Sequence, residues 1–206
     1  GAINASYFET DGTGYPANLV VRNNQILHFG RKSVDATGPN FYDFAFGLNQ
    51  QGKPVIDAYQ PTINVTVGGK TMPVSTANTL RQADQITLFT PIHRTQTVAQ
   101  AASAFATEIV VTNASKDTSK LSFGDTVTGK VSQVTKLGQP ANSVIPKDGF
   151  VISANGARLA EELKNVNVGD TVSLSLTVDQ KWMNSQTMLA TGPLLVQDGK
   201  VNISMS

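Results

Sequence analysis

Ile63-Asn64-Val65-Thr66-Val67-Gly68-Gly69-Lys70-Thr71-Met72-Pro73-Val74 is a clear strand, turn and strand pattern. The Gly-Gly pair supplies the turn, so the stretch predicts a β-hairpin. A second hairpin is predicted upstream, where Asn23-Asn24 separates residues 19–22 from residues 25–28. Asparagine tolerates the positive φ angle that such turns require. Successive hairpins indicate an antiparallel meander.

Further strands are predicted on both sides of this hairpin. They cover residues 41–48, 55–58, 85–90, 108–112 and 150–153, and the last hairpin turns at Asp198-Gly199. Residues 157–165 favour a helix, because Leu159 and Leu163 are four positions apart. Residues 77–82 are compatible with one more helical turn, and the Ala-rich residues 98–107 stay open between helix and loop.

These patterns predict an α+β fold that is mostly antiparallel β-sheet, with one or two short helices. The 206 residues are expected to form one domain, with a β-rich lobe at about 115–180. Within that lobe, Phe123-Gly-Asp-Thr-Val127 and Val168-Gly-Asp-Thr-Val172 resemble each other. We interpret this as shared turn chemistry, because a true repeat would need more matching positions.

Composition narrows the possible functions. Only 15% of the residues are charged, and 16 basic against 15 acidic residues give a net charge of +1, so no nucleic-acid partner is predicted. Cysteine is absent, which excludes disulfides, thiolate metal sites and a cysteine nucleophile. The low charge is typical of secreted and wall-associated proteins. No apolar run approaches the roughly 18 residues of a membrane span, and we expect any signal peptide to lie outside this chain.

Two distant stretches combine apolar and polar residues in a way that is typical of a site at a strand end. Gly1-Ala-Ile-Asn-Ala-Ser-Tyr-Phe8 places Asn4 in an apolar strand, shortly before Glu9 and Asp11. Ala190-Thr-Gly-Pro-Leu-Leu-Val-Gln-Asp-Gly-Lys200 is the second stretch.

Together with the hairpin of residues 15–28 and Ile145-Pro-Lys-Asp-Gly-Phe-Val-Ile-Ser-Ala-Asn-Gly156, these stretches resemble the phosphodiester glycosidase family. That family includes N-acetylglucosamine-1-phosphodiester alpha-N-acetylglucosaminidase and bacterial exopolysaccharide or cell-wall proteins. The resemblance implies hydrolysis of a sugar-1-phosphodiester, with an N-acetylhexosamine as the sugar, and an extracellular or cell-wall location. In the family an Arg-Thr strand and an L-D-G-G-G-S motif follow. This chain has neither, so we expect either a truncated domain that is active only when the rest of the site is supplied, or a relative that has lost the second half of the site.

The resemblance makes Asn4 a candidate catalytic residue that orients the sugar or phosphate. Glu9 and Asp11 are the nearest carboxylates in sequence and therefore candidates for acid-base roles, although both are also compatible with solvated loop acids. Neither a cofactor nor a metal is predicted, because His28 and His93 lack carboxylates at metal-ligand spacing.

Candidate substrate-binding residues are of three kinds. His93 and Arg94 follow a predicted strand, where they could hold a phosphate. Tyr7 and Trp182 could stack on sugar rings, and Trp182 is expected to be exposed because Lys181 and Asn184 flank it. Gly192 could bring backbone close to a ligand, and each of these residues is also compatible with a purely structural role.

A second hypothesis relies on the same low charge and polar surface but includes no catalysis. The chain would then be a secreted carbohydrate-binding or wall-binding module that loses glycan binding on Trp182→Ala. In both cases the partner is a carbohydrate or sugar-phosphate polymer. If strands that pair with an absent segment leave edges open, self-association through those edges is expected.

Overall fold

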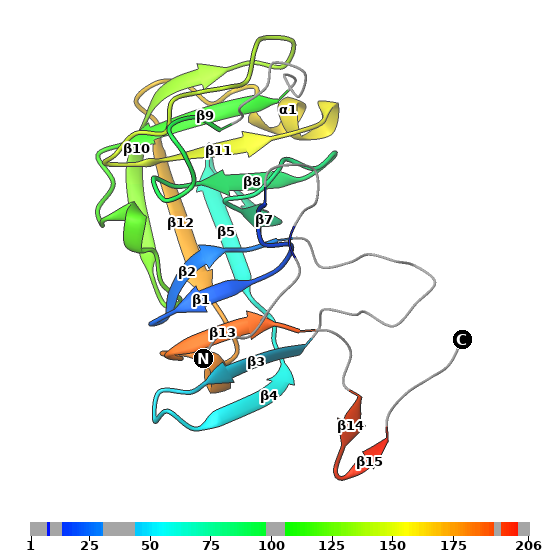
Figure 1. The fold of residues 1–206 in the computed structure, drawn as a ribbon. Coiled ribbons are helices and arrows are strands. Elements are labelled where there is room, and N and C mark those ends of the chain that lie inside the picture. The colour runs from blue at the N-terminus through cyan, green and yellow to red at the C-terminus, as the bar shows by residue number, and fades with distance from the viewer. Residues whose placement is uncertain (1–7, 9–13, 31–43, 98–105, 192–194, 202–206) are drawn as a thin grey trace.

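The computed structural model describes residues 8, 14–30, 44–97, 106–191 and 195–201, and the predicted fold class is confirmed (Figure 1). The described residues form mostly antiparallel β-sheet with a single α-helix. The Ala-rich run lies largely outside the described residues.

A five-stranded sheet contains the first predicted hairpin. In spatial order its strands are β2 (Gln25–His28), β1 (Val20–Arg22), β13 (Thr187–Ala190), β3 (Phe44–Leu48) and β4 (Pro54–Ala58). Every neighbouring pair is antiparallel. Asn23 and Asn24 have φ angles of 51° and 61°, which confirms the turn predicted between β1 and β2.

An eight-stranded sheet forms the larger part of the molecule. In spatial order its strands are β6 (Lys70–Pro73), β5 (Thr62–Val67), β12 (Thr171–Thr177), β10 (Thr126–Thr135), β9 (Thr107–Thr112), β11 (Phe150–Ala154), β8 (Ile86–Phe89) and β7 (Thr76–Ala77). All pairs are antiparallel except β7 with β8. The Gly68-Gly69 turn between β5 and β6 has φ angles of 57° and 75°, which confirms the hairpin predicted there.

The larger sheet curls until its two edges meet in one stretch of chain. Its edge strands β6 and β7 are separated only by Val74 and Ser75. Val74 N–H donates to the carbonyl of Ile63 on β5, and Ser75 N–H donates to the carbonyl of Ile86 on β8, each at 2.8 Å. Residues 70–77 therefore close the sheet on itself, and the apolar residues that face inward share one core.

Strand β2 joins the two sheets. At one end Ile26 N–H donates to the carbonyl of Leu121 at 2.8 Å. At the other end Phe29 and Ala77 exchange two backbone hydrogen bonds of 3.0 and 2.8 Å. One large hydrophobic cluster consequently includes residues of both sheets, and a smaller cluster of Phe89, Val110, Ile145 and Val151 lies apart from it.

The two Gly-Asp turns have the same geometry. Asp125 accepts a hydrogen bond from Ser122 N–H, and Asp170 accepts one from Asn167 N–H, each at 2.9 Å. Each turn leads into a strand, β10 after the first turn and β12 after the second, and these two strands pair with each other. The turns differ in burial, because Phe123 lies in the core whereas Val168 is 67% exposed.

The helical predictions have mixed outcomes. The predicted helix is confirmed as α1 (Ala157–Leu163), with Leu159 and Leu163 buried. A helical turn over residues 77–82 is wrong, because Ala77 pairs with Leu88 in the sheet and Asn78 has a φ angle of 58°. The remaining elements are two 3-10 helices, η2 (Thr118–Lys120) and η3 (Gln180–Trp182), and the separate hairpin of β14 (Val196–Gln197) and β15 (Lys200–Val201). No helix in the described part is long and apolar enough to cross a bilayer.

Candidate functional site

The predicted site residues fall into two groups. Asn4, Tyr7, Glu9, Asp11 and Gly192 lie outside the described residues, so their predicted roles stay predictions. His93, Arg94 and Trp182 are described, and only the first two lie where a ligand could reach them.

Trp182 is a structural residue, and its predicted exposure is wrong. The ring is 1% exposed, and its Nε1 donates to the carbonyl of Ala58 at 2.8 Å. Gly47 on β3 makes room for it, since a Cβ at that position would lie 2.9 Å from Cζ3 of Trp182. The polar neighbours of Trp182 misled the prediction, because η3 turns the ring inward while its flanks stay at the surface.

His93 and Arg94 form an aromatic and cationic group with Tyr15. The rings of Tyr15 and His93 are stacked with centroids 5.3 Å apart, and the Arg94 guanidinium lies 4.8 Å from the centroid of the Tyr15 ring. Phe89, at the end of β8, supports the other side of His93 with a centroid distance of 4.8 Å. Arg94 itself is exposed, so a permanent positive charge beside an aromatic ring faces solvent.

Burial keeps the His93 ring neutral. Desolvation lowers its pKa to about 4, and the positive charge of Arg94 acts in the same direction. Backbone groups of Asn78 and Thr97 act in the opposite direction but do not compensate. At neutral pH the only cation in this group is therefore Arg94.

His28 lies beside this group, although 65 residues separate the two histidines in the sequence. It is 3% exposed, and burial lowers its pKa. Its Nδ1 lies 2.7 Å from the carbonyl oxygen of Asn18. Because a carbonyl can only accept, Nδ1 carries the proton and Nε2 of the neutral ring is left as an acceptor.

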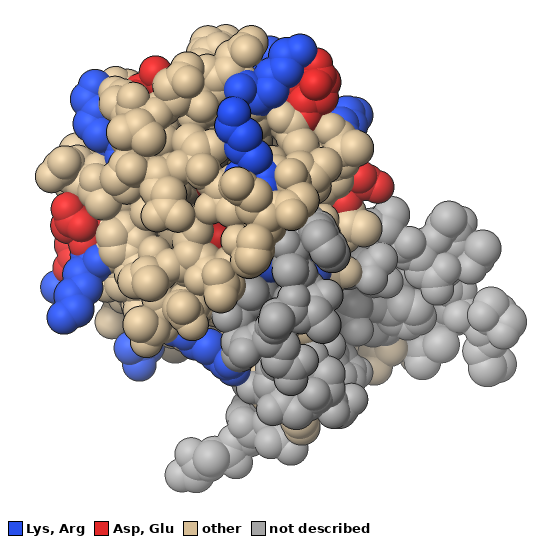
Figure 2. All heavy atoms as spheres, turned by 90° about the horizontal axis from the view of Figure 1, so that it is seen from above, with Lys and Arg blue, Asp and Glu red and all other residues tan. Residues whose placement is uncertain are grey.

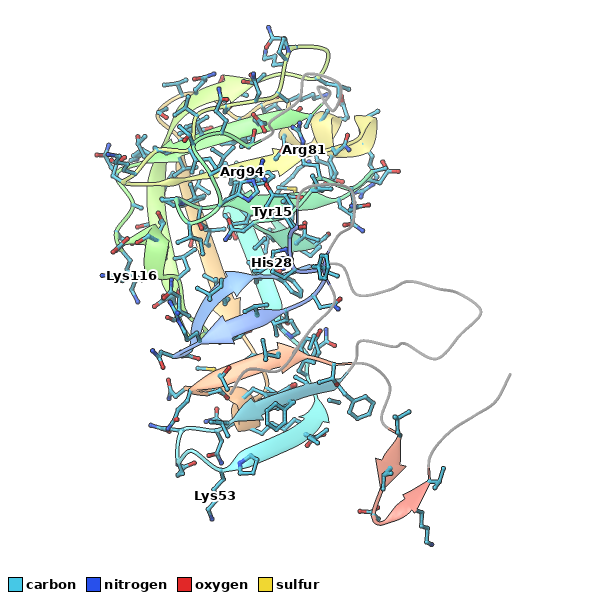
Figure 3. The ribbon with its side chains drawn as sticks, in the orientation of Figure 1. Tyr15, His28, Lys53, Arg81, Arg94 and Lys116 are labelled. Atoms are coloured by element: carbon cyan, nitrogen blue, oxygen red, sulfur yellow. The ribbon has the colours of Figure 1, made fainter. Side chains whose placement is uncertain are left out.

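Asn78 links β2, which contains His28, to Thr90, which directly follows β8. Its side chain donates to the carbonyl of Leu27 on β2 at 3.3 Å and accepts from Thr90 N–H at 2.9 Å. Figure 3 shows Tyr15 and Arg94 above His28, where β2 approaches β7 and β8. We call Tyr15, Asn18, His28, His93 and Arg94 the two-histidine cluster.

Several buried polar atoms of this region meet no hydrogen-bond partner among the described residues. They are Asn18 Nδ2, His28 Nε2, His93 Nδ1 and Thr97 Oγ1. Unsatisfied buried polar atoms are uncommon in folded proteins, and each has a free-energy cost unless water or a ligand fills the position. Their accumulation at the two-histidine cluster marks it as the candidate binding site.

A second set of buried polar residues, which the sequence did not reveal, is held together by an ion pair and hydrogen bonds. The Arg81 guanidinium lies 3.1 Å from Glu108 Oε1, and these side chains are 2% and 0% exposed. Arg81 also donates to Ser153 Oγ at 3.0 Å and to the carbonyl of Ala141 at 2.8 Å, while Ser143 N–H donates to Glu108 Oε2 at 2.9 Å. We call this set the Arg81–Glu108 network.

The residues that sequence reasoning missed left only weak signals. Asn18 stands in the Gly-Tyr-Pro-Ala-Asn loop, which was used only for its resemblance. Glu108 is the one charged residue of β9, whose other residues are apolar or threonine. An ionisable residue in such a strand is the one available sign of a buried ion pair.

The described residues offer no metal-ligand cluster, and the face in Figure 2 carries charges of both signs. The described residues include no group of three or more His, Cys, Asp or Glu able to hold a metal ion. Figure 2 shows one face on which Lys and Arg are interspersed with Asp and Glu over a largely uncharged surface.

Comparison with known proteins yields structural relatives alone. No protein family is matched by this sequence, and no curated protein matches it. The solved structure of a hypothetical protein from Synechocystis superposes with a TM-score of 0.69 at 19% identity, covering 98% of this chain and 33% of that protein. A Burkholderia pseudomallei protein named "Putative exported protein" superposes with a TM-score of 0.58 at 16% identity, covering 92% of this chain and 40% of that protein. These likenesses establish a shared fold, and this chain spans less than half the length of either relative.

Proposed function

We propose that this chain is a phosphodiester glycosidase-like domain that binds a sugar-1-phosphodiester, with an N-acetylhexosamine as the sugar. The sequence motifs of residues 1–28, 145–156 and 190–200 support the proposal. The exported relative in Burkholderia pseudomallei supports a location outside the cell, where wall polymers and exopolysaccharides are the available substrates.

The observation that carries the proposal is the position of Arg94 over Tyr15. A guanidinium binds phosphate oxygens through paired N–H groups. The neutral His93 beneath Tyr15 leaves the phosphate with one dominant cation. In this assignment Arg94 binds the phosphodiester, and Tyr15, whose ring packs against both the guanidinium and His93, positions Arg94.

Chemistry at the anomeric carbon requires groups from other parts of the site. A phosphodiester is a good leaving group, so positioning and charge stabilisation contribute more than acid assistance. Asn4 is proposed to orient the sugar or phosphate, and Glu9 or Asp11 to act in proton transfer. The rest of the catalytic groups would come from the part of the full-length protein that lies outside this chain.

The test is sugar release from an N-acetylglucosamine-1-phosphodiester. We would compare this chain with a version extended by about a hundred following residues of its parent protein. We expect release only from the longer version, and we expect Arg94→Ala to weaken it by about tenfold or more, because a charge-assisted hydrogen bond contributes roughly 1.5–3 kcal/mol. Arg158→Ala, which removes an exposed arginine on α1, is the matched control and should leave release unchanged.

The other outcome points to a binding module. If neither version releases sugar while both are folded, and glycan binding is saturable and lost on Tyr15→Ala, the chain is a non-catalytic carbohydrate-binding module. Trp182→Ala is unsuitable for this purpose because the ring is buried, so loss of binding would report loss of folding.

A further inference from the structure

The two-histidine cluster contains a donor and an acceptor on neighbouring residues, both without partners among the described residues. Asn18 and His28 are joined by the 2.7 Å hydrogen bond between His28 Nδ1 and the Asn18 carbonyl. Asn18 Nδ2 and His28 Nε2 are both buried and unpaired. The residues themselves are 2% and 3% exposed, so bulk water does not solvate these atoms.

The chemical character of each atom is fixed. Asn18 Nδ2 belongs to an amide NH₂ group and can only donate. His28 Nε2 can only accept, because the proton of the neutral ring is held on Nδ1 by the Asn18 carbonyl. Burial lowers the pKa of His28, so the ring remains neutral at physiological pH and keeps this acceptor.

A ligand that satisfies both atoms must donate one hydrogen bond and accept another. A phosphate diester or a carboxylate has no proton to give to Nε2, and an ammonium group has no lone pair for the amide. A hydroxyl group supplies both, since it donates one hydrogen bond and accepts others. The pair is therefore complementary to a neutral hydroxyl.

We propose that Asn18 and His28 form a hydroxyl-binding subsite that holds a sugar hydroxyl of the substrate. This inference rests on the proposed function and deepens it, because it divides recognition between two neighbouring groups. Arg94, positioned by Tyr15, binds the phosphate, and Asn18 and His28 bind a hydroxyl.

The surrounding groups are consistent with a neutral ligand. The charged or titratable neighbours that face the cluster are His93, which burial keeps neutral, and the exposed Arg94. The remaining described neighbour, Asn78, uses its side chain on Leu27 and Thr90. No carboxylate of the described residues forms a hydrogen bond or ion pair with Asn18 or His28, so the ring has no nearby anion to favour its protonation.

The first experiment is an NMR titration of this chain with N-acetylglucosamine and, separately, with methyl phosphate. We expect N-acetylglucosamine to shift the His28 Nε2 and Asn18 Nδ2 resonances, and methyl phosphate to shift Arg94 instead. An unshifted His28 Nε2 at saturating sugar would overturn the subsite and leave a structural water as the partner of these atoms.

Substitutions give the second measurement. His28→Phe keeps a ring of similar shape without the acceptor, and we expect it to weaken N-acetylglucosamine binding by about 3- to 10-fold. His28→Gln, whose amide supplies both a donor for the Asn18 carbonyl and an acceptor, should recover part of that loss. Both variants should bind methyl phosphate as the unsubstituted chain does, which also shows that they are folded.

The outcomes separate this inference from the proposed function. If the longer protein releases sugar with unchanged affinity after His28→Phe, the subsite is wrong and the glycosidase proposal stands. If no version releases sugar but N-acetylglucosamine binding still depends on His28, the subsite stands and the catalytic proposal is wrong.

Discussion

The Arg81–Glu108 network and the two-histidine cluster are both buried and polar, but they differ in how many of their hydrogen bonds are made. Arg81 donates to Glu108, Ser153 and the Ala141 carbonyl, and Glu108 also accepts from Ser143 N–H. Both charged side chains of the network are therefore paired, and the Ser143 hydroxyl is its one atom without a described partner. In the two-histidine cluster, Asn18, His28 and His93 each have an atom without a described partner. A satisfied network fixes strand positions, whereas unsatisfied atoms gain a partner only when something else binds. Satisfaction of hydrogen bonds, more than polarity or burial, therefore distinguishes the two groups.

The most direct test of this comparison removes one partner of the Arg81–Glu108 network. Glu108→Ala leaves the Arg81 charge buried and unpaired, and we expect it to lower the free energy of unfolding by roughly 3–5 kcal/mol. Urea denaturation would measure the loss. The double variant Arg81→Met, Glu108→Leu should lose clearly less, because no buried charge remains. Equal losses for the two variants would show that packing, not charge, determines the effect.

Low pH should lower the stability of the protein through the two-histidine cluster. Both histidines have folded pKa values below the ordinary 6.5, with His93 at about 4. Below pH 6.5 the unfolded chain binds protons that the folded chain does not, so stability falls as the pH drops toward 4 and is unaffected above 6.5. The loss is at most about 1.4 kcal/mol per pH unit for each histidine. Thermal unfolding between pH 4 and 8 measures it, and a His93→Gln variant with an unchanged slope would contradict this origin.

Two isosteric substitutions compare a buried hydroxyl that has a hydrogen-bond partner with one that has none among the described residues. Thr87 on β8 shares a 2.8 Å hydrogen bond with Thr76, and both are buried. Thr87→Val leaves the Thr76 hydroxyl unpaired and should lower the free energy of unfolding by about 1–3 kcal/mol. Thr97→Val removes a hydroxyl that has no described partner and should leave stability unchanged or slightly raised. Chemical denaturation of both variants measures the two changes. Equal losses of unfolding free energy would show that a hydrogen-bond partner does not distinguish the two hydroxyls.

The smallest effect is expected for an ion pair at the surface. Arg158 and Glu162 lie four positions apart on α1 with a nitrogen to oxygen distance of 2.7 Å, and both are substantially exposed. Glu162→Gln should lower the free energy of unfolding by less than about 1 kcal/mol. The difference should fall further at 1 M salt, which screens exposed charges. A loss comparable to that of Glu108→Ala would show that burial is not what distinguishes the two pairs.

The sequence predicted local structure better than it predicted the site. Gly68-Gly69, Asn23-Asn24 and the Leu159 and Leu163 pair gave correct elements, because turn chemistry and helical spacing are local properties. The pairing of β13 with β1 and β3, or of β12 with β5, was out of reach, since such contacts join distant segments through side chains of ordinary type. Trp182 failed for the same reason, because its inward position depends on Gly47 in another strand.

The site was predictable only in part. His93 and Arg94 were identified because an imidazole and a guanidinium after a strand suggest anion binding. Tyr15, Asn18 and His28 join them only through the fold, which brings the end of β2 to β7 and β8. The predictions for Asn4, Glu9 and Asp11 depend on residues that the structure does not describe.

Closure of the larger sheet depends on a single backbone connection. Val74 and Ser75 bind opposite edges of that sheet through their own N–H groups. New chain termini placed between them would cut the connection between β6 and β7, so that the two edges of the sheet could move apart. New termini in the exposed loop of residues 136–139 would leave that connection intact. A circularly permuted protein should therefore fold when opened at the second place and associate through its edges when opened at the first.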